Sequence, residues 1–486
     1  MTTGSWTLAV LLGLFVYTAL AVHVYRRHKQ PGLAAVMFMA AFWTVLGAFA
    51  VITAKGGTPS AAFSYLESRT YPVLLNEAYA QTLAIYFAFL IIFLAILTLV
   101  KPWPTRDRVA TVTAVREVLS YFPLILAVLV AMAGLALQFL IVQQLTGTIG
   151  TTSLYDAASN TSIPRAVLRL NNYLNLATSA VISVTTVAIV VRASKQGLRP
   201  NSILGIATAI AMIGAQYRIN VVLGTRSATL ILALSIIIGL AAYGWGLVQG
   251  SVSKRTRWIL GILGLVALYL IGAIGLARTN SNYGAQSQSS IVSYLFNPAA
   301  ILEELSGAGA EGELLPAHFS LYHVFNSGLN VGGLIPYWDS TYRAYASQLL
   351  LPADQGFTIH LVAGWWLVAG VLAPLLAALQ LGGLIYLLLW IARRNLTLWS
   401  ACWIFVATTW AMASVPVTSL RSGPEGLRGT LTAALLVPFV STVVLWLIAF
   451  KRWQRASRVE PEVERASTRR ADKSPAPVPT GQRSDS

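Results

Sequence analysis

Residues 203–247 read ILGIATAIAMIGAQYRINVVLGTRSATLILALSIIIGLAAYGWGL, two apolar runs separated by a short polar turn. Each run is about twenty residues long, which is the length that a helix needs to cross the hydrocarbon core of a bilayer. Helices are favoured there, because lipid offers no hydrogen-bond partner for backbone N–H and C=O groups. The stretch therefore predicts two membrane-spanning helices joined by a turn at Gly224-Thr225-Arg226.

The same pattern of apolar runs and short polar breaks recurs along the whole chain of 486 residues. Hydrophobic residues make up 56% of the chain and charged residues only 10%, whereas a soluble domain carries about a quarter charged residues. We expect an all-α, polytopic helical membrane protein with about eleven transmembrane helices and a large extracytoplasmic loop. The predicted spans are residues 6–25, 33–53, 79–100, 119–144, 173–192, 203–222, 227–247, 258–277, 359–392, 397–416 and 429–450.

Lysine and arginine clusters follow every second span, and this alternation predicts the orientation of the chain. The formal net charge is +17, which the positive-inside rule explains without a nucleic-acid partner. The clusters begin at Arg26, Lys101, Arg192, Lys254, Arg393 and Lys451. We expect this side to be the cytoplasm of a bacterial inner membrane, with the N-terminus periplasmic and the C-terminus cytoplasmic.

These features divide the chain into five predicted regions. They are N-terminal transmembrane helices (1–200), transmembrane helices with the Gly-Thr-Arg turn (201–277), a large periplasmic loop (278–358), C-terminal transmembrane helices (359–450) and a disordered cytoplasmic tail (451–486). The span at 359–392 is too long for one straight crossing, so we expect it to tilt, to project beyond the bilayer, or to bend at Pro374 or Gly382-Gly383.

Arginines on the predicted outer side are the first candidate site residues. Arginine presents a planar fork that binds phosphate or carboxylate at two points, whereas lysine is a point charge. Arg226 is the leading candidate, because a charge so close to hydrocarbon is costly and a helix start beside it is a natural anion site. The candidates for binding a diphosphate or glycan are Arg226, Arg218, Arg278 and Arg343. The alternative is that these arginines only contact lipid head groups or acidic loop residues.

Histidines are the second group of candidates, because a neutral imidazole can accept a proton from a sugar hydroxyl near neutral pH. His318 and His323 lie in the predicted loop, and His360 begins the ninth span. The alternative for His360 is a helix-end residue at the lipid interface beside Trp365 and Trp366. The spacing of the histidines does not match a zinc site. The single cysteine, Cys402, cannot form a disulfide within the chain.

Other chemistries lack their sequence signatures. The chain has no Gly-x-x-x-x-Gly-Lys-Ser/Thr motif for an ATP-driven pump and no Gly-x-Ser-x-Gly elbow for a serine hydrolase. The predicted spans contain almost no Asp or Glu, which disfavours a proton relay across the membrane.

A combination of features over about residues 203–392 resembles a known family. Gly224-Thr225-Arg226 opens a span on the outer side, one large outer loop follows, and His360 then starts a span with Gly370 ten residues on. This layout resembles the Wzy-type O-antigen and oligosaccharide repeat-unit polymerases. These are relatives of the O-antigen ligases in the GT-C-type membrane glycosyltransferase class.

The resemblance implies a metal-independent glycosyl transfer from undecaprenyl diphosphate carrying an oligosaccharide, with no cofactor. It also implies that Arg226 holds the diphosphate and that a loop histidine or arginine assists the acceptor hydroxyl. His360 matches the base of the ligase branch by position, but a polar residue usually follows that histidine and here it is Leu361. We therefore expect a polymerase. A flippase and a chain-length regulator are the protein partners that the resemblance suggests. A ligase-type transfer to an acceptor, and a transporter or flippase of lipid-linked sugars, are the alternatives.

Overall fold

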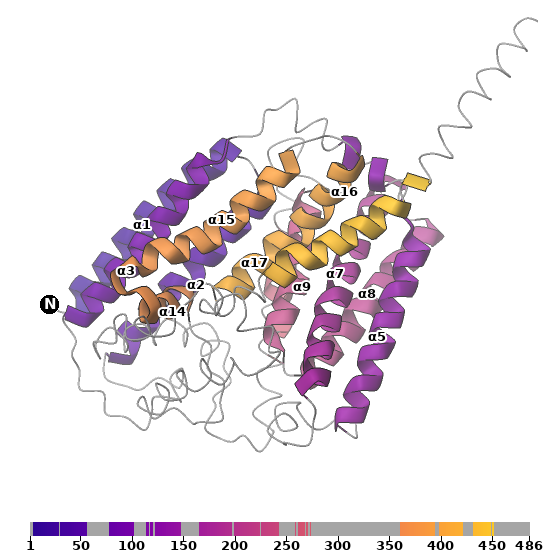
Figure 1. Ribbon diagram of the computed structural model, residues 1–486, viewed down its shortest axis with the longest axis horizontal. Helices are drawn as coiled ribbons and strands as arrows, with labels where there is room; N and C mark the ends of the chain where they lie inside the picture. The colour runs from indigo at the N-terminus through magenta and orange to yellow at the C-terminus, as the bar shows by residue number, and fades with distance from the viewer. Residues whose placement is uncertain are drawn as a thin grey trace, which may run out of the picture.

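Long helices lie at several of the predicted spans in the computed structural model (Figure 1). The structure describes residues 3–28, 30–55, 77–101, 122–146, 165–196, 199–223, 225–242, 360–393, 398–420 and 431–448, with further residues within 113–119, 258–273 and 450–451. These residues are almost all helical and include no β-strand. The main helices are α1 (Thr3–His28), α2 (Pro31–Lys55), α3 (Glu77–Leu99), α5 (Leu124–Thr146), α7 (Arg165–Gln196), α8 (Pro200–Val222), α9 (Arg226–Gly239), α14 (Leu361–Ala369), α15 (Ala373–Arg393), α16 (Leu398–Val406) and α17 (Met412–Ser419).

Several of these helices are suited to a membrane. In the described part of the chain, five segments are long and apolar enough to cross one: Leu124–Gln144, Leu170–Ala193, Pro200–Val222, Gly370–Trp390 and Leu398–Ser419. On α5, Ile125 is 80% exposed and Leu129 is 60% exposed, which is costly in water but favourable against lipid tails. The described fold is thus all-helical, and its apolar helices are compatible with a multi-pass membrane protein, while the number of about eleven spans stays a prediction. The predicted 278–358 loop and the tail beyond residue 451 lie outside the described residues.

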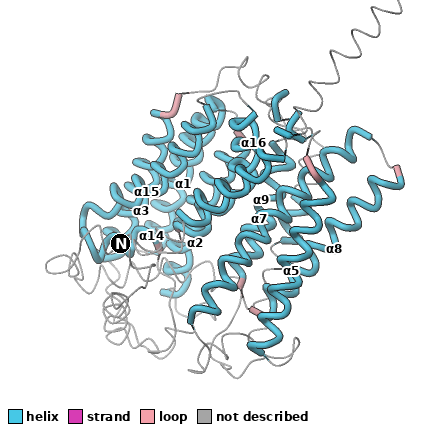
Figure 2. Tube along the Cα trace, turned by 45° about the vertical axis from the view of Figure 1, so that its right-hand side comes forward, coloured by secondary structure: helices cyan, strands magenta, loops and turns pink. Residues whose placement is uncertain are grey.

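The described helices form two groups, which Figures 1 and 2 show from two directions. The first group brings α1, α2 and α3 together with α14 and α15, which come much later in the chain. The second consists of α5, α7, α8 and α9, consecutive among the described long helices. Helix α17 joins the groups, because it contacts α2 on one side and α9 on the other.

Helix α15 packs along α3 and forms much of the core of the first group. Phe93 and Leu97 on α3 and Leu381 and Ile385 on α15 are fully buried. Gly382 lies at their contact, where a Cβ atom would come within 3.0 Å of Cγ2 of Ile96. This glycine therefore serves close helix packing, and α15 runs through the Gly382-Gly383 pair without ending there.

The bend in the long ninth span lies at Gly370, and not at the predicted positions. Gly370 ends α14 with φ 51° and ψ −126°, a conformation that glycine adopts without a Cβ penalty. A single 3₁₀ turn, η3 (Gly370–Leu372), follows, and α15 then begins. Pro374 is the second residue of α15, where the missing N–H costs no hydrogen bond.

Helix α9 ends in a tight contact with its neighbours at Gly239. A Cβ atom there would lie 2.6 Å from Cγ2 of Val187 on α7 and 2.9 Å from Cγ2 of Thr409 in the π-helical turn η4 (Ala407–Ala411). Both neighbours are short, β-branched and packed within the bundle, so they have little freedom to move aside.

We therefore expect Gly239→Ala to lower the free energy of unfolding by about 1–3 kcal/mol, the usual effect of overpacking. The matched control is Gly214→Ala on α8, where nothing lies within 4 Å of the added Cβ. That variant should unfold at or slightly above the wild-type temperature, because alanine favours helix. Thermal unfolding of the two purified variants in detergent tests the comparison, and equal melting temperatures would contradict the packing.

Candidate functional site: a turn held by buried amides

The turn between α8 and α9 is fastened to the helix that precedes it. Helix α8 ends at Val222 and α9 begins at Arg226. The backbone N–H of Thr225 donates to the carbonyl oxygen of Asn220 at 2.9 Å, and its hydroxyl donates to Oδ1 of the same residue at 3.2 Å. Two bonds to one residue of α8 thus set the position of the residue just before α9.

Asn220 is completely buried and links three helices. Its Oδ1 accepts a hydrogen bond from Nδ2 of Asn175 on α7 at 2.8 Å. Its Nδ2 donates to the hydroxyl of Thr229 on α9 at 3.1 Å. The side chain therefore ties α7, α8 and the first turn of α9 together.

A second layer of amides extends this arrangement to α5. Nε2 of Gln216, one turn before Asn220 on α8, donates to Oδ1 of Asn220 at 3.4 Å. Gln216 and Gln138 on α5 also exchange two hydrogen bonds, at 3.3 and 3.4 Å. We call Gln138, Asn175, Gln216 and Asn220 the amide network; all four are buried.

Buried amides inside apolar helices need a reason, because an unpaired amide in hydrocarbon is costly. Each member of the amide network has at least one partner of its own kind on another helix. Asn171, one turn before Asn175 on α7, is also buried, and its Oδ1 has no hydrogen-bond partner among the residues that the structure describes. The polar face of α7 therefore continues beyond the amide network, toward the N-terminal end of that helix.

Among the described residues, no side chain caps the N-terminus of α9. Thr225 occupies the N-cap position, but its hydroxyl is bonded to Asn220 and caps nothing on α9. This differs from the simple expectation for a threonine at such a position. The first N–H groups of a helix have no partner within the helix, so α9 presents donors and the positive end of its dipole at this turn.

Two of the predicted arginines, Arg226 and Arg218, lie near this turn on different helices. Arg226 is the first residue of α9, next to the uncapped N-terminus. Its side chain, like Gly224, lies outside what the structure describes. Arg218 lies on α8 about one turn before the helix end and is exposed, whereas Gln216 and Asn220 on the same helix are buried. Arg218 thus takes no part in the amide network.

His360 is placed as a helix cap inside the other group of helices. It is fully buried, and its Nδ1 accepts a hydrogen bond from the backbone N–H of Val362 at 3.2 Å, which caps α14. Nε2 must then carry the proton, and it lies 3.4 Å from the hydroxyl oxygen of Thr44 on α2. That hydroxyl donates in turn to the carbonyl of Ala40 at 2.6 Å. Both ring nitrogens of His360 are therefore engaged.

The surroundings of His360 are apolar and aromatic. Its ring meets Tyr86 and Phe89 of α3 edge to face, with ring centroids 5.2 and 6.1 Å apart. Trp366 is 1% exposed and Trp365 donates from Nε1 to Gln380 at 2.8 Å, so the two tryptophans pack inside the bundle and not as a belt at the lipid interface. The helix-end placement of His360 is confirmed, but its interfacial setting is wrong.

The starts of α9 and α14 lie at the same end of the bundle. Gly239, at the end of α9, meets Thr409 just before α17, and α17 also packs on α9. The two helices are therefore antiparallel, and the start of α9 lies toward the end of α17. There the backbone N–H of Leu361 donates to the carbonyl of Leu420 at 3.3 Å. Arg226, as the first residue of α9, and His360, just before α14, thus lie toward the same end of the described bundle.

The other predicted site residues cannot be placed. His318, His323, Arg278 and Arg343 lie outside the described residues. Among the residues that are described, no three His, Cys, Asp or Glu side chains gather closely enough to hold a metal ion. The catalytic and substrate-binding roles of all seven candidates stay predictions.

The sequence reasoning missed the amide network, although a signal was present. The predicted site residues were all ionisable, whereas the members of the amide network are neutral. Asn171 and Asn175, and likewise Gln216 and Asn220, are spaced four apart, which places each pair on one face of a helix. Two such pairs within apolar runs are a recognisable sign of a polar contact between helices.

No protein-family model, no curated protein and no solved structure matches this chain.

The dual bonding of His360 leads to a test of its role. Asparagine is a good N-cap but not a proton acceptor at neutral pH, so His360→Asn should keep the fold and His360→Ala should lower the free energy of unfolding by about 1 kcal/mol or more. Thermal unfolding in detergent separates the two variants. If the ring acts only as a cap, cells that carry His360→Asn should keep the glycan elongation that the resemblance predicts. Loss of that elongation by a stably folded His360→Asn protein would support the predicted role of His360 as a base.

Proposed function

We propose that this chain is a membrane glycosyltransferase that polymerises oligosaccharide repeat units carried on undecaprenyl diphosphate, at the periplasmic face of the inner membrane. The observation that carries the proposal is the α8–α9 turn. An arginine is the first residue of a helix whose N-cap residue, Thr225, makes no capping hydrogen bond, at a turn that is hydrogen-bonded to Asn220. Diphosphate is the ligand chemistry that suits this combination, because helix N–H groups and a guanidinium both bind phosphate oxygens.

The reaction is a substitution at the anomeric carbon of the donor glycan. The acceptor hydroxyl oxygen forms the new glycosidic bond, and the bond from that carbon to the diphosphate breaks. Undecaprenyl diphosphate leaves with the electron pair, and the hydroxyl proton passes to a base or to the leaving diphosphate. Since diphosphate is already a good leaving group, we expect positioning and charge stabilisation to supply most of the rate enhancement.

The bundle supports this assignment by keeping the turn in a fixed place. The amide network connects the turn to α5 and α7 through buried hydrogen bonds. Pre-organised donors need not rearrange when charge develops on the leaving group, and this is what makes them effective in the transition state. A surface arginine on a mobile loop would not have this advantage.

Deletion of the gene, followed by electrophoresis of surface glycans, tests the proposal against its alternatives. A polymerase mutant should retain a single repeat unit on its acceptor, and the full chain supplied in trans should restore long glycans. A ligase mutant should carry no repeat unit, and a transporter mutant should accumulate lipid-linked units on the cytoplasmic leaflet. Glycans of normal length in the deletion strain would overturn all three functions.

A further inference from the structure

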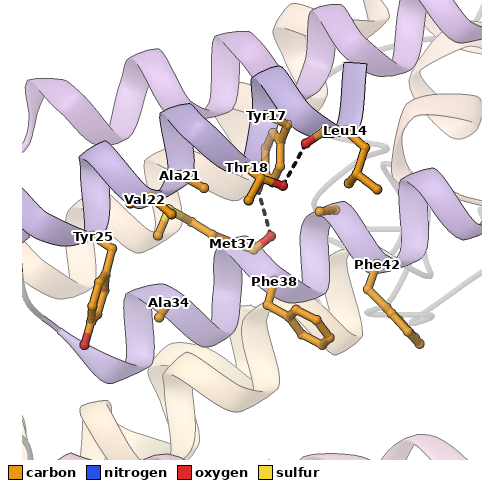
Figure 3. A pocket seen from close by; sticks show the side chains of 11 residues that line it. Leu14, Tyr17, Thr18, Ala21, Val22, Tyr25, Ala34, Met37, Phe38 and Phe42 are labelled. Carbon is orange, nitrogen blue, oxygen red and sulfur yellow. Dashed lines mark hydrogen bonds between the residues drawn. The ribbon is translucent and has the colours of Figure 1, made fainter. Parts of the chain in front are cut away.

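An apolar groove runs between α1 and α2 (Figure 3). It has a volume of about 440 Å³, and the described residues that line it all belong to these two helices. Tyr25 lies at one end, where the chain turns from α1 into α2, and Leu14 and Phe42 lie at the other. This volume falls in the usual range of small-ligand sites, about 300–1,000 Å³.

The long part of the groove offers hydrocarbon and no free hydrogen bond. The hydroxyl of Tyr17 donates to the carbonyl of Met37 at 2.8 Å, and that of Thr18 donates to the carbonyl of Leu14 at 2.7 Å. Figure 3 shows both bonds as dashed lines. The other residues that line this part of the groove, such as Phe38 and Ala21, are apolar. An occupant of this part must therefore be an apolar chain.

The end of the groove at Tyr25 has the opposite character. Tyr25 carries a phenol group there, and it is followed by Arg26 and Arg27 in the last turn of α1. Both arginines are exposed. An apolar groove with a phenol at one end, followed in the same helix by two exposed arginines, matches a molecule with a hydrocarbon chain and an anionic phosphate head.

We propose that the groove between α1 and α2 binds an anionic phospholipid, with one acyl chain between Tyr17 and Phe38 and the phosphate at Arg26 and Arg27. The site lies in the leaflet on the side of the α1–α2 turn, which the sequence predicts to be cytoplasmic. Charge complementarity selects the head group, because each arginine close to a membrane surface favours an anionic lipid over a zwitterionic one. The proposal is independent of the glycosyl transfer proposed above.

Native mass spectrometry of the purified full chain tests this site with two lipids of identical acyl chains, phosphatidylglycerol and phosphatidylcholine. Wild type should bind phosphatidylglycerol more tightly, on the order of tenfold. The double variant Arg26→Gln/Arg27→Gln should lose this preference. The matched control Arg199→Gln/Lys451→Gln removes two exposed charges from other helix ends and should keep it.

A second pair of variants tests the groove itself. Ala34 lines the groove, so Ala34→Phe should fill it and weaken binding of both lipids, whereas Ala211→Phe on the exposed face of α8 should not. Equal binding of the two lipids by wild type, or a preference that survives in Arg26→Gln/Arg27→Gln, would overturn the proposal. A third result would also overturn it. If inorganic phosphate competed with lipid and Ala34→Phe bound lipid as wild type does, the arginines would form an anion site without a lipid groove.

Discussion

Replacing Arg226 by Lys is expected to reduce glycan elongation on the order of a hundredfold while the protein remains inserted and folded. Lysine keeps the positive charge, so the topology of the α8–α9 hairpin should survive. It loses the planar fork that holds a diphosphate at two points. A leaving group that is held at one point can rotate away from the attacking hydroxyl, and this misalignment costs far more rate than weaker binding does.

Glycan chain length in cells that carry the Arg226→Lys protein at normal abundance is the measurement. The matched control is Arg199→Lys, at the opposite end of α8, where the arginine is exposed and the helix begins. We expect wild-type chain length in the control. Wild-type chain length in Arg226→Lys would show that the arginine meets only head groups, because either side chain can reach them.

Asn220→Leu should produce the largest loss of stability among single substitutions at the turn. Leucine is similar in size, but it leaves Asn175, Thr225 and Thr229 without the partner that each has now. Each buried polar group left unpaired costs about 1–3 kcal/mol in water-soluble proteins and somewhat less in membranes. We expect the free energy of unfolding to fall by about 2 kcal/mol or more.

The matched control is Asn172→Leu on α7, which removes the same amide from an exposed position. Surface substitutions of this kind usually change stability by less than about 0.5 kcal/mol. Thermal unfolding of both variants in one detergent gives the comparison. If Asn220→Leu melted together with Asn172→Leu, the amide network would not be what holds the turn.

The helices were predictable because the apolar runs are long and their polar ends are sharp. Helix α8 ends at Val222 and α9 starts at Arg226, within a residue of the predicted span boundaries. The bend at Gly370 was not predictable in the same way, because its positive φ is a backbone property that the sequence does not display. Pro374 and Gly382-Gly383 were equally reasonable positions from composition alone.

The candidate site was predictable only in part. The sequence identified Arg226 at the start of a span, because a charged residue next to an apolar run can be recognised without knowing how the helices pack. The contact between Asn175 and Asn220 joins residues 45 positions apart, and that between Gln138 and Gln216 joins residues 78 positions apart. Such pairings depend on how helices pack, and the sequence of a single helix does not specify its neighbours. The burial of His360 against α2 and α3 is missed for the same reason.

The most direct test of the proposed glycosyl transfer uses the purified full chain, reconstituted in lipid, with one oligosaccharide repeat unit on undecaprenyl diphosphate as the sole sugar substrate. The account predicts lipid-linked chains of two or more units, with one undecaprenyl diphosphate released for each bond formed, and neither product from the Arg226→Lys protein. Persistence of the single unit with wild-type protein, under conditions in which the protein is folded, would contradict the account.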